Sequence, residues 1–228
     1  MSVKQALKFR RRFLKIGALS ATSLLLATGF RQQSNPQSLL TPGQTEGPFY
    51  PTRGQLDVDM DLTHIKGHTK KAEGQVIMVS GRVMDQFGDP VPQALIDIWQ
   101  ANSFGKYHHE LDQRRVKIDK DFQGWGTLQT DNKGNYQFLS VKPGPYPADG
   151  KWIRPPHVHF KIAKRGYREL TTQMYFSGEP LNHKDLLLLE LSEQEQRQLV
   201  VDFSKDPKRK QLNGQFDIVL SKISADKL

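Results

Sequence analysis

Two histidines stand two positions apart in the stretch Trp152-Ile-Arg-Pro-Pro-His-Val-His-Phe. Successive side chains of an extended strand point to opposite faces, so His157 and His159 share one face of such a strand. Two imidazoles on one face can converge on a single metal ion. Histidine pairs also occur on ordinary solvated strands, so this spacing alone leaves both readings open.

Two tyrosines are the other candidate donors, Tyr107 and Tyr146, each expected in a loop that follows a strand. A phenol with its ordinary pKa of about 10 is a poor ligand, but a strongly charged metal favours the phenolate. Phenolate is a hard anionic donor, so two phenolates with two imidazoles suit Fe(III) better than zinc or copper(I). Taken singly, either tyrosine is more simply a packed aromatic with a hydrogen-bonded hydroxyl.

Several separated motifs are spread along the chain. They are Thr41-Pro-Gly-Gln-Thr-Glu-Gly-Pro-Phe-Tyr-Pro, Gly81-Arg-Val-Met-Asp-Gln-Phe-Gly-Asp-Pro-Val-Pro, Asp97-Ile-Trp-Gln-Ala-Asn, Lys142-Pro-Gly-Pro-Tyr-Pro, Trp152-Ile-Arg-Pro-Pro-His-Val-His-Phe, Thr172-Gln-Met-Tyr-Phe and Phe216-Asp-Ile-Val-Leu. These motifs and their order make the chain resemble the intradiol ring-cleaving dioxygenases, and the beta-type chain of the protocatechuate 3,4-dioxygenases most closely. The resemblance runs from about Thr41 to Ser221.

This resemblance implies a non-haem Fe(III) site with four protein ligands. The equatorial pair would be Tyr107 and His159, and the axial pair Tyr146 and His157. His108 and His109, beside Tyr107, are not expected to be ligands, because the iron must keep positions open for substrate. The remaining histidines considered are expected at the surface or in loops, and these are His64, His68 and His183.

The resemblance also implies a reaction and three catalytic residues. Dioxygen would cleave a catechol-type aromatic diol between its two hydroxyl carbons, giving a cis,cis-muconate-type diacid. Arg154 would lie over the substrate ring, Gln173 would share the pocket, and Tyr146 would be displaced by the diol and take a substrate proton. As alternatives without catalysis, Arg154 pairs with a surface carboxylate and Gln173 satisfies backbone groups in a strand.

Some positions depart from the family pattern. Ala148 and Asp149 stand where an aromatic residue is expected soon after Tyr146, which puts the substrate-facing wall in doubt. Near the N-terminus, Gly47-Pro-Phe-Tyr resembles the alpha-type chain of the same enzymes, with Phe49 at a position where tyrosine is common. One chain would then combine features that protocatechuate enzymes divide between two subunits.

Residues 1–29 resemble a twin-arginine signal segment. Arg10-Arg-Arg-Phe-Leu-Lys fits the pattern Arg-Arg-x-Phe-Leu-Lys, and a moderately apolar run over residues 16–27 follows it. That run is shorter than the roughly 20 residues of a bilayer span. We expect the twin-arginine translocation machinery to export the protein to the periplasm or beyond, with an uncleaved leader acting as a membrane anchor as the alternative. Residues 30–40 are expected to be a linker, and 41–228 one dioxygenase domain.

The net charge bears on whether the protein binds nucleic acid, and the cysteine content bears on what stabilises its fold. The formal net charge is +9, and removing residues 1–29, which hold six Lys and Arg and no acid, leaves +3 (9 − 6). The high isoelectric point is therefore weak support for nucleic-acid binding, which we do not expect. Without cysteine, the fold must rest on its core or on metal. The family ranges from dimers to large assemblies, so a homo-oligomer stays open.

From residue 75 onward, short runs of branched and aromatic residues alternate with turn signals, a pattern typical of a β-sandwich. Strands are expected over 76–83, 95–100, 136–141, 157–162, 170–176 and 216–220. One helix is expected near 192–204, where Ser192 and Glu195 have capping-box spacing. The resemblance implies an immunoglobulin-like or prealbumin-like sandwich, mainly β, with long loops and one or two short helices.

Two other functions fit the same sequence less well. An exported, non-catalytic β-sandwich could bind aromatic or sugar ligands, but it would not need the set of two tyrosines and two histidines. A hydrolase with another metal, such as zinc, would not favour two phenolates.

Overall fold

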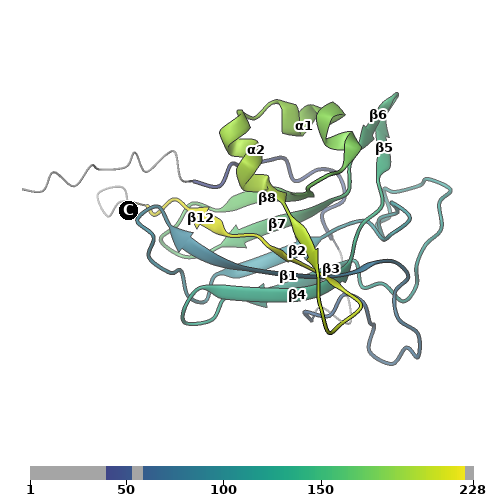
Figure 1. Cartoon of the computed structure of the whole chain (residues 1–228), viewed down its shortest axis with the longest axis horizontal. Helices are drawn as coiled ribbons and strands as arrows, with labels where there is room; N and C mark the ends of the chain where they lie inside the picture. The colour runs from purple at the N-terminus through teal and green to yellow at the C-terminus, as the bar shows by residue number, and fades with distance from the viewer. Residues whose placement is uncertain (1–39, 53–58, 224–228) are drawn as a thin grey trace, which may run out of the picture. The chain divides into compact units, whose positions relative to one another are not determined.

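The computed structural model describes residues 40–52 and 59–223. The predicted signal segment and all but the last residue of the predicted linker lie outside these ranges. The described residues form twelve strands and three short helices, so they are mainly β as predicted (Figure 1). None of the helices in the described ranges is long and apolar enough to cross a membrane.

One five-stranded sheet is built around β1 (Val76–Asp85). β4 (Asn135–Val141) pairs with β1 in the antiparallel direction. β11 (Leu212–Gln215) and β12 (Ile218–Leu220) pair in parallel with successive parts of β1. β10 (Phe203–Lys205) extends the sheet beyond β11.

The second five-stranded sheet carries both histidines and has the order β3-β2-β7-β8-β9. Its strands are β3 (Trp125–Gln129), β2 (Leu95–Trp99), β7 (His157–Ala163), β8 (Leu170–Phe176) and β9 (Val200–Val201). All neighbours are antiparallel except β8 and β9, which run parallel. The central strand β7 thus places the histidine pair between β2 and β8.

The remaining elements lie beside the second sheet (Figure 1). β5 (Tyr146–Asp149) and β6 (Trp152–Arg154) form a two-stranded hairpin. The 3-10 helix η2 (Pro180–Lys184) packs against β6 and is followed by α1 (Leu186–Leu189). α2 (Glu193–Leu199) packs against β8 and β9.

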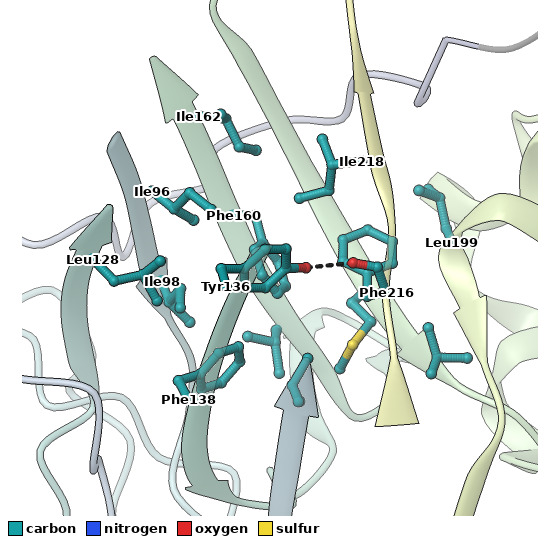
Figure 2. Packing of buried hydrophobic residues seen from close by; sticks show 14 of the residues in the cluster. Ile96, Ile98, Leu128, Tyr136, Phe138, Phe160, Ile162, Leu199, Phe216 and Ile218 are labelled. Carbon is teal, nitrogen blue, oxygen red and sulfur yellow. Dashed lines mark hydrogen bonds between the residues drawn. The ribbon is translucent and has the colours of Figure 1, made fainter. Parts of the chain in front are cut away.

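A single large apolar core joins residues of both sheets (Figure 2). Ile77 and Val79 alternate along β1 with no exposed surface, and Ile96 of β2 and Phe160 of β7 are equally buried. This alternation fits strands that have one face on a core. Two sheets that share one core make a β-sandwich, and the predicted fold class is confirmed.

Gly81 allows β1 to meet the chain between β11 and β12. A Cβ at this position would lie 1.9 Å from the backbone oxygen of Phe216, so a larger residue would require the backbone to move. Tyr136 donates its hydroxyl hydrogen to the same oxygen at 2.5 Å, as Figure 2 shows.

The predicted helix over 192–204 is too long. Ser192 caps α2 with the predicted capping box to Glu195, but the helix ends at Leu199. Val200 and Val201 instead pair with β8, because β-branched residues suit a sheet that offers a free edge. The sequence prediction also missed strands β3, β5, β6, β9, β10 and β11.

Candidate metal centre

Strand β7 turns His157 and His159 to the same side, as its alternation predicts. Val158 and Phe160 belong to the apolar core, whereas each histidine is 2% exposed and outside it. The Nε2 atoms of the two rings lie 3.2 Å apart. Trp99 of β2 stacks on the ring of His159, with centroids 4.7 Å apart, and so fixes its orientation.

Tyr107 places a third donor atom beside the two Nε2 atoms. Its hydroxyl oxygen lies 3.1 Å from Nε2 of His159 and 3.4 Å from Nε2 of His157. Ligand bonds of about 2.1 Å at a right angle place two donor atoms about 3.0 Å apart. The three atoms therefore have the mutual spacing that one metal ion requires.

Tyr146 completes the predicted set, but from a strand and not from the predicted loop, since β5 begins at this residue. Its ring centroid lies 5.4 Å from that of Tyr107 and 5.6 Å from that of His157. The two tyrosine segments meet backbone to backbone, with Gly144 N donating to Asn102 O at 2.9 Å. A Cβ at Gly105 would lie 2.2 Å from Pro145 O, so glycine permits this approach.

The tyrosine loop is held by one buried carboxylate. Asp112 accepts from the backbone N–H of Tyr107 at 2.8 Å and from Nε of Arg114 at 2.8 Å. The ammonium of Lys106 donates to the same carboxylate at 3.2 Å. Burial alone would raise the pKa of Asp112, but the hydrogen bonds from Arg114, Tyr107 and Lys106 together lower it. The ionised carboxylate thus fixes the backbone that presents Tyr107.

The protonation of the four side chains suits a metal site. Burial and the nearby charge of Arg154 lower the pKa of His157 and of His159 well below 6.5, so both rings are neutral. His157 Nδ1 lies 2.7 Å from the backbone oxygen of Pro155 and donates its hydrogen there, which leaves the Nε2 lone pair available. Burial raises the pKa of both Tyr107 and Tyr146, so they become phenolates only beside a strong positive charge.

We also asked whether carboxylates could complete a metal site with the histidines in the described ranges. The described ranges contain no group of three or more His, Cys, Asp and Glu side chains that could hold a metal ion. The donor atoms that lie beside His157 and His159 are instead phenol oxygens, such as that of Tyr107. That donor set fits Fe(III).

A cavity of about 530 Å³ opens beside these donors. Tyr146, His159 and Arg154 line it, together with residues 45–49, 111–114, 147–149, Trp152 and Leu187. Ala148 and Asp149, which replace the expected aromatic residue, form part of its wall. The cavity therefore adjoins the donor atoms and the predicted catalytic arginine.

Residues 41–50 form a strap across the second sheet and supply one wall of the cavity. Gln44 N donates to Thr171 O at 2.8 Å, and Gln173 Nε2 donates to Thr45 O at 3.0 Å. Phe49 stacks on Tyr107 with ring centroids 4.5 Å apart. The strap thus forms part of the cavity wall and also contacts Tyr107, one of the predicted ligands.

Arg154, which lines the cavity, lies against Gln173. Arg154 Nη2 donates to Gln173 Oε1 at 2.7 Å, and the register of β7 and β8 pairs Gln173 with His159. Arg154 is 4% exposed and its carboxylate partner, Asp185, is fully buried. The surface ion pair considered for Arg154 is therefore wrong, while Gln173 also satisfies a backbone group of the strap.

The other histidines lie elsewhere. His109 is half-buried, with Nε2 3.1 Å from the backbone oxygen of Tyr50, and His108 is exposed. His68 pairs with Asp121 at 2.9 Å.

Comparison with known proteins agrees with this geometry. A family model described as "Dioxygenase" matches residues 45–222. The chain belongs to this dioxygenase family. This dioxygenase is 39% identical over 181 residues to the protocatechuate 3,4-dioxygenase beta chain of Burkholderia cepacia, covering 76% of each chain. It is 31% identical over 157 residues to catechol 1,2-dioxygenase 2 of Acinetobacter lwoffii, of which it spans 52%.

Solved structures show the same fold. The 3-chlorocatechol 1,2-dioxygenase of Rhodococcus opacus 1CP superposes with a TM-score of 0.64 at 22% identity, covering 80% of this chain and 73% of that one. The dioxygenase domain of a carbohydrate-binding fusion protein from Streptomyces sp. SirexAA-E gives 0.59 at 28% identity, covering 81% and 99%. The family match and the sequence relatives together confirm the predicted intradiol ring-cleaving dioxygenase.

The sequence prediction for this dioxygenase missed Asp112 and Asp185. Both are buried carboxylates that hold an arginine near the donor atoms. Asp112 lies five residues after Tyr107, so its contact could have been predicted from a charged residue in the same short loop. Asp185 lies in a different element from Arg154, and no local pattern indicates the contact.

Proposed function

We propose that the protein is a non-haem Fe(III) intradiol dioxygenase that uses O2 to cleave a catechol-type diol between its hydroxyl carbons. One observation carries the proposal: the Tyr107 oxygen and the Nε2 atoms of His157 and His159 lie within 3.1–3.4 Å of one another beside a cavity. The ligands would be these three residues and Tyr146. When bound, Fe(III) supplies Lewis acidity that favours the deprotonated diol.

Tyr146 is assigned the proton-accepting role because of its place in the cavity. It lines the cavity, whereas Tyr107 does not. A diol that enters from the cavity therefore reaches Tyr146 before Tyr107, and Tyr146, as the phenolate that a bound Fe(III) would favour, would accept a hydroxyl proton. Tyr107 lies under Phe49, which keeps its oxygen in place.

Arg154 is assigned the stabilisation of negative charge on the substrate ring. Its guanidinium is fixed by hydrogen bonds and borders the cavity. A fixed cation in a site with little water needs no reorganisation when charge appears on the substrate. Gln173 accepts from this guanidinium and so helps to hold it.

The substrate class follows from relatives whose names specify protocatechuate, catechol and hydroxyquinol. All three offer two neighbouring hydroxyl groups. We propose a diol of this class as the substrate, with O2 as the second reactant.

Product analysis tests the reaction. Leaderless protein loaded with iron is mixed with catechol, protocatechuate or hydroxyquinol under 18O2, and the products are identified by mass spectrometry. The proposal predicts a ring-opened cis,cis-muconate-type diacid that carries both oxygen atoms of one O2. Recovery of every diol unchanged, or a product without 18O, would contradict it.

We also propose export by the twin-arginine pathway, supported by Arg10-Arg-Arg-Phe-Leu-Lys. The test is fractionation of cells that express the full chain. Export is expected to stop when Arg10→Lys and Arg11→Lys are combined, and equal export of this variant would contradict the proposal. Because Lys keeps the positive charge of Arg, loss of export in this variant reports on the arginine pair and not on the charge of residues 1–29.

A further inference from the structure

Arg154 is held by a carboxylate that reaches it from another element. Its Nε donates to Oδ1 of Asp185 at 2.8 Å, and its Nη2 approaches Oδ2 at 3.3 Å. Asp185 is fully buried and lies between η2 and α1, 31 residues from Arg154 in sequence. Burial of both partners strengthens the interaction, because water does not compete for it.

Among the residues that the structure describes, the other contacts of the guanidinium leave one nitrogen without a partner. Nη2 also donates to Gln173 Oε1 at 2.7 Å and to the Tyr175 hydroxyl at 3.1 Å. Nη1 makes no hydrogen bond to the described residues. A planar guanidinium held through Nε and Nη2 cannot rotate, so Nη1 keeps one position. Because Arg154 lines the cavity, Nη1 is the nitrogen left for a ligand.

Asp185 also fixes neighbouring parts of the cavity wall. Trp152 Nε1 donates to its Oδ1 at 3.1 Å, and the guanidinium carbon of Arg154 lies 5.4 Å from the centre of the Trp152 ring. Trp152 and Leu187, two residues beyond Asp185, both line the cavity. The Asp185 carboxylate thus fixes Arg154 and the adjacent part of the cavity wall relative to each other.

We propose that Asp185 is a positioning residue for ring cleavage, which fixes the plane of the Arg154 guanidinium so that Nη1 meets the bound diol. This inference rests on the proposed function. The carboxylate cancels part of the positive charge of Arg154, so a pure charge effect predicts faster turnover when Asp185 loses its charge. A positioning effect predicts slower turnover, because a displacement of about 1 Å can cost about 100-fold in rate.

The test compares Asp185→Asn, Arg154→Ala and the double variant. Asp185→Asn is expected to lower kcat by about 10- to 100-fold with a smaller change in KM. Because Asp185 acts through Arg154, the double variant should be no slower than Arg154→Ala. Wild-type kcat in Asp185→Asn, or effects of the two changes that multiply in the double variant, would overturn the inference.

Glu179→Gln is the matched control. It removes the ion pair of Glu179 with Lys142, beside η2, without touching Arg154. Its kcat should stay within about twofold of wild type, since this half-buried ion pair does not line the cavity. A loss equal to that of Asp185→Asn would show that the segment as a whole, and not the contact with Arg154, sets the rate, which would also overturn the inference.

A measurement on the wild type covers the case in which Asp185→Asn fails to fold. In 1H–15N spectra, the Nε–H of Arg154, assigned by its loss in Arg154→Ala, should exchange with water at least tenfold more slowly than that of the exposed Arg165. Equal exchange would overturn the inference. If the wild type neither binds iron nor cleaves a diol, the proposed function fails and Asp185 has no catalytic role, while slow exchange would still show that the Arg154 Nε–H is protected, as its buried hydrogen bond to Asp185 predicts.

Discussion

The hydroxyl oxygen of Tyr107 lies 3.1 Å from Nε2 of His159, although 52 residues separate them in the chain. The loop after β2 and the central strand β7 thus bring together two donors that share no local pattern. Burial keeps the phenol protonated and the imidazole neutral, so the pair carries no charge until a cation enters. Several variants test the consequences.

Tyr107→Phe removes one donor atom and little else. Iron content is expected to fall at least tenfold, since the remaining donors lose an anionic oxygen. The measurement is iron per chain after dialysis, with unfolding by urea as the check on folding. Full iron occupancy with unchanged colour would exclude Tyr107 as a ligand.

Arg154→Ala tests whether Arg154 acts in the ring-cleavage step or in the binding of iron and diol. The variant is expected to keep its iron and to bind the diol in the absence of oxygen, but to lose about 100- to 1,000-fold in kcat, as when one charge-stabilising group is removed. Stopped-flow kinetics with single-turnover analysis would measure this. An unchanged rate would remove Arg154 from the mechanism.

Phe49→Ala tests the strap. The stacking of Phe49 on Tyr107 at 4.5 Å contributes about 0.5–1.5 kcal/mol beyond its buried area. We expect a lower free energy of unfolding and a weaker hold on iron. Phe87, which is 68% exposed, provides the control as Phe87→Ala, with little change in either quantity. Equal behaviour of the two variants would show that the strap does not support the site.

The Asp112 carboxylate predicts a dependence of stability on acid. Its pKa in the folded protein is lowered, so its contribution is complete above its unfolded pKa of about 3.9 and is lost as the pH falls through the folded pKa. Asp112→Asn should therefore be less stable than wild type near pH 7, and the difference should shrink below about pH 4. Urea unfolding at several pH values measures this. A difference that stays constant with pH would contradict the assignment.

Much of the site could be predicted because its chemistry lies in short local motifs. The alternation around His157 and His159 and the turns before Tyr107 and Tyr146 are visible in the sequence. The strap and Asp185 could not be predicted, because they act through contacts between distant segments, such as Gln173 with Thr45. Helix α2 illustrates the same limit: its capping box fixed the start, while pairing of Val200 with β8 decided its end.

Binding of Fe(III) by Tyr107, Tyr146, His157 and His159 is tested by iron content and a visible spectrum of the leaderless protein, repeated with catechol or protocatechuate in the absence of oxygen. We expect about one iron per chain and a red-brown tyrosinate-to-Fe(III) band that shifts when the diol is added. A folded, colourless protein that gains no colour from added iron would contradict it.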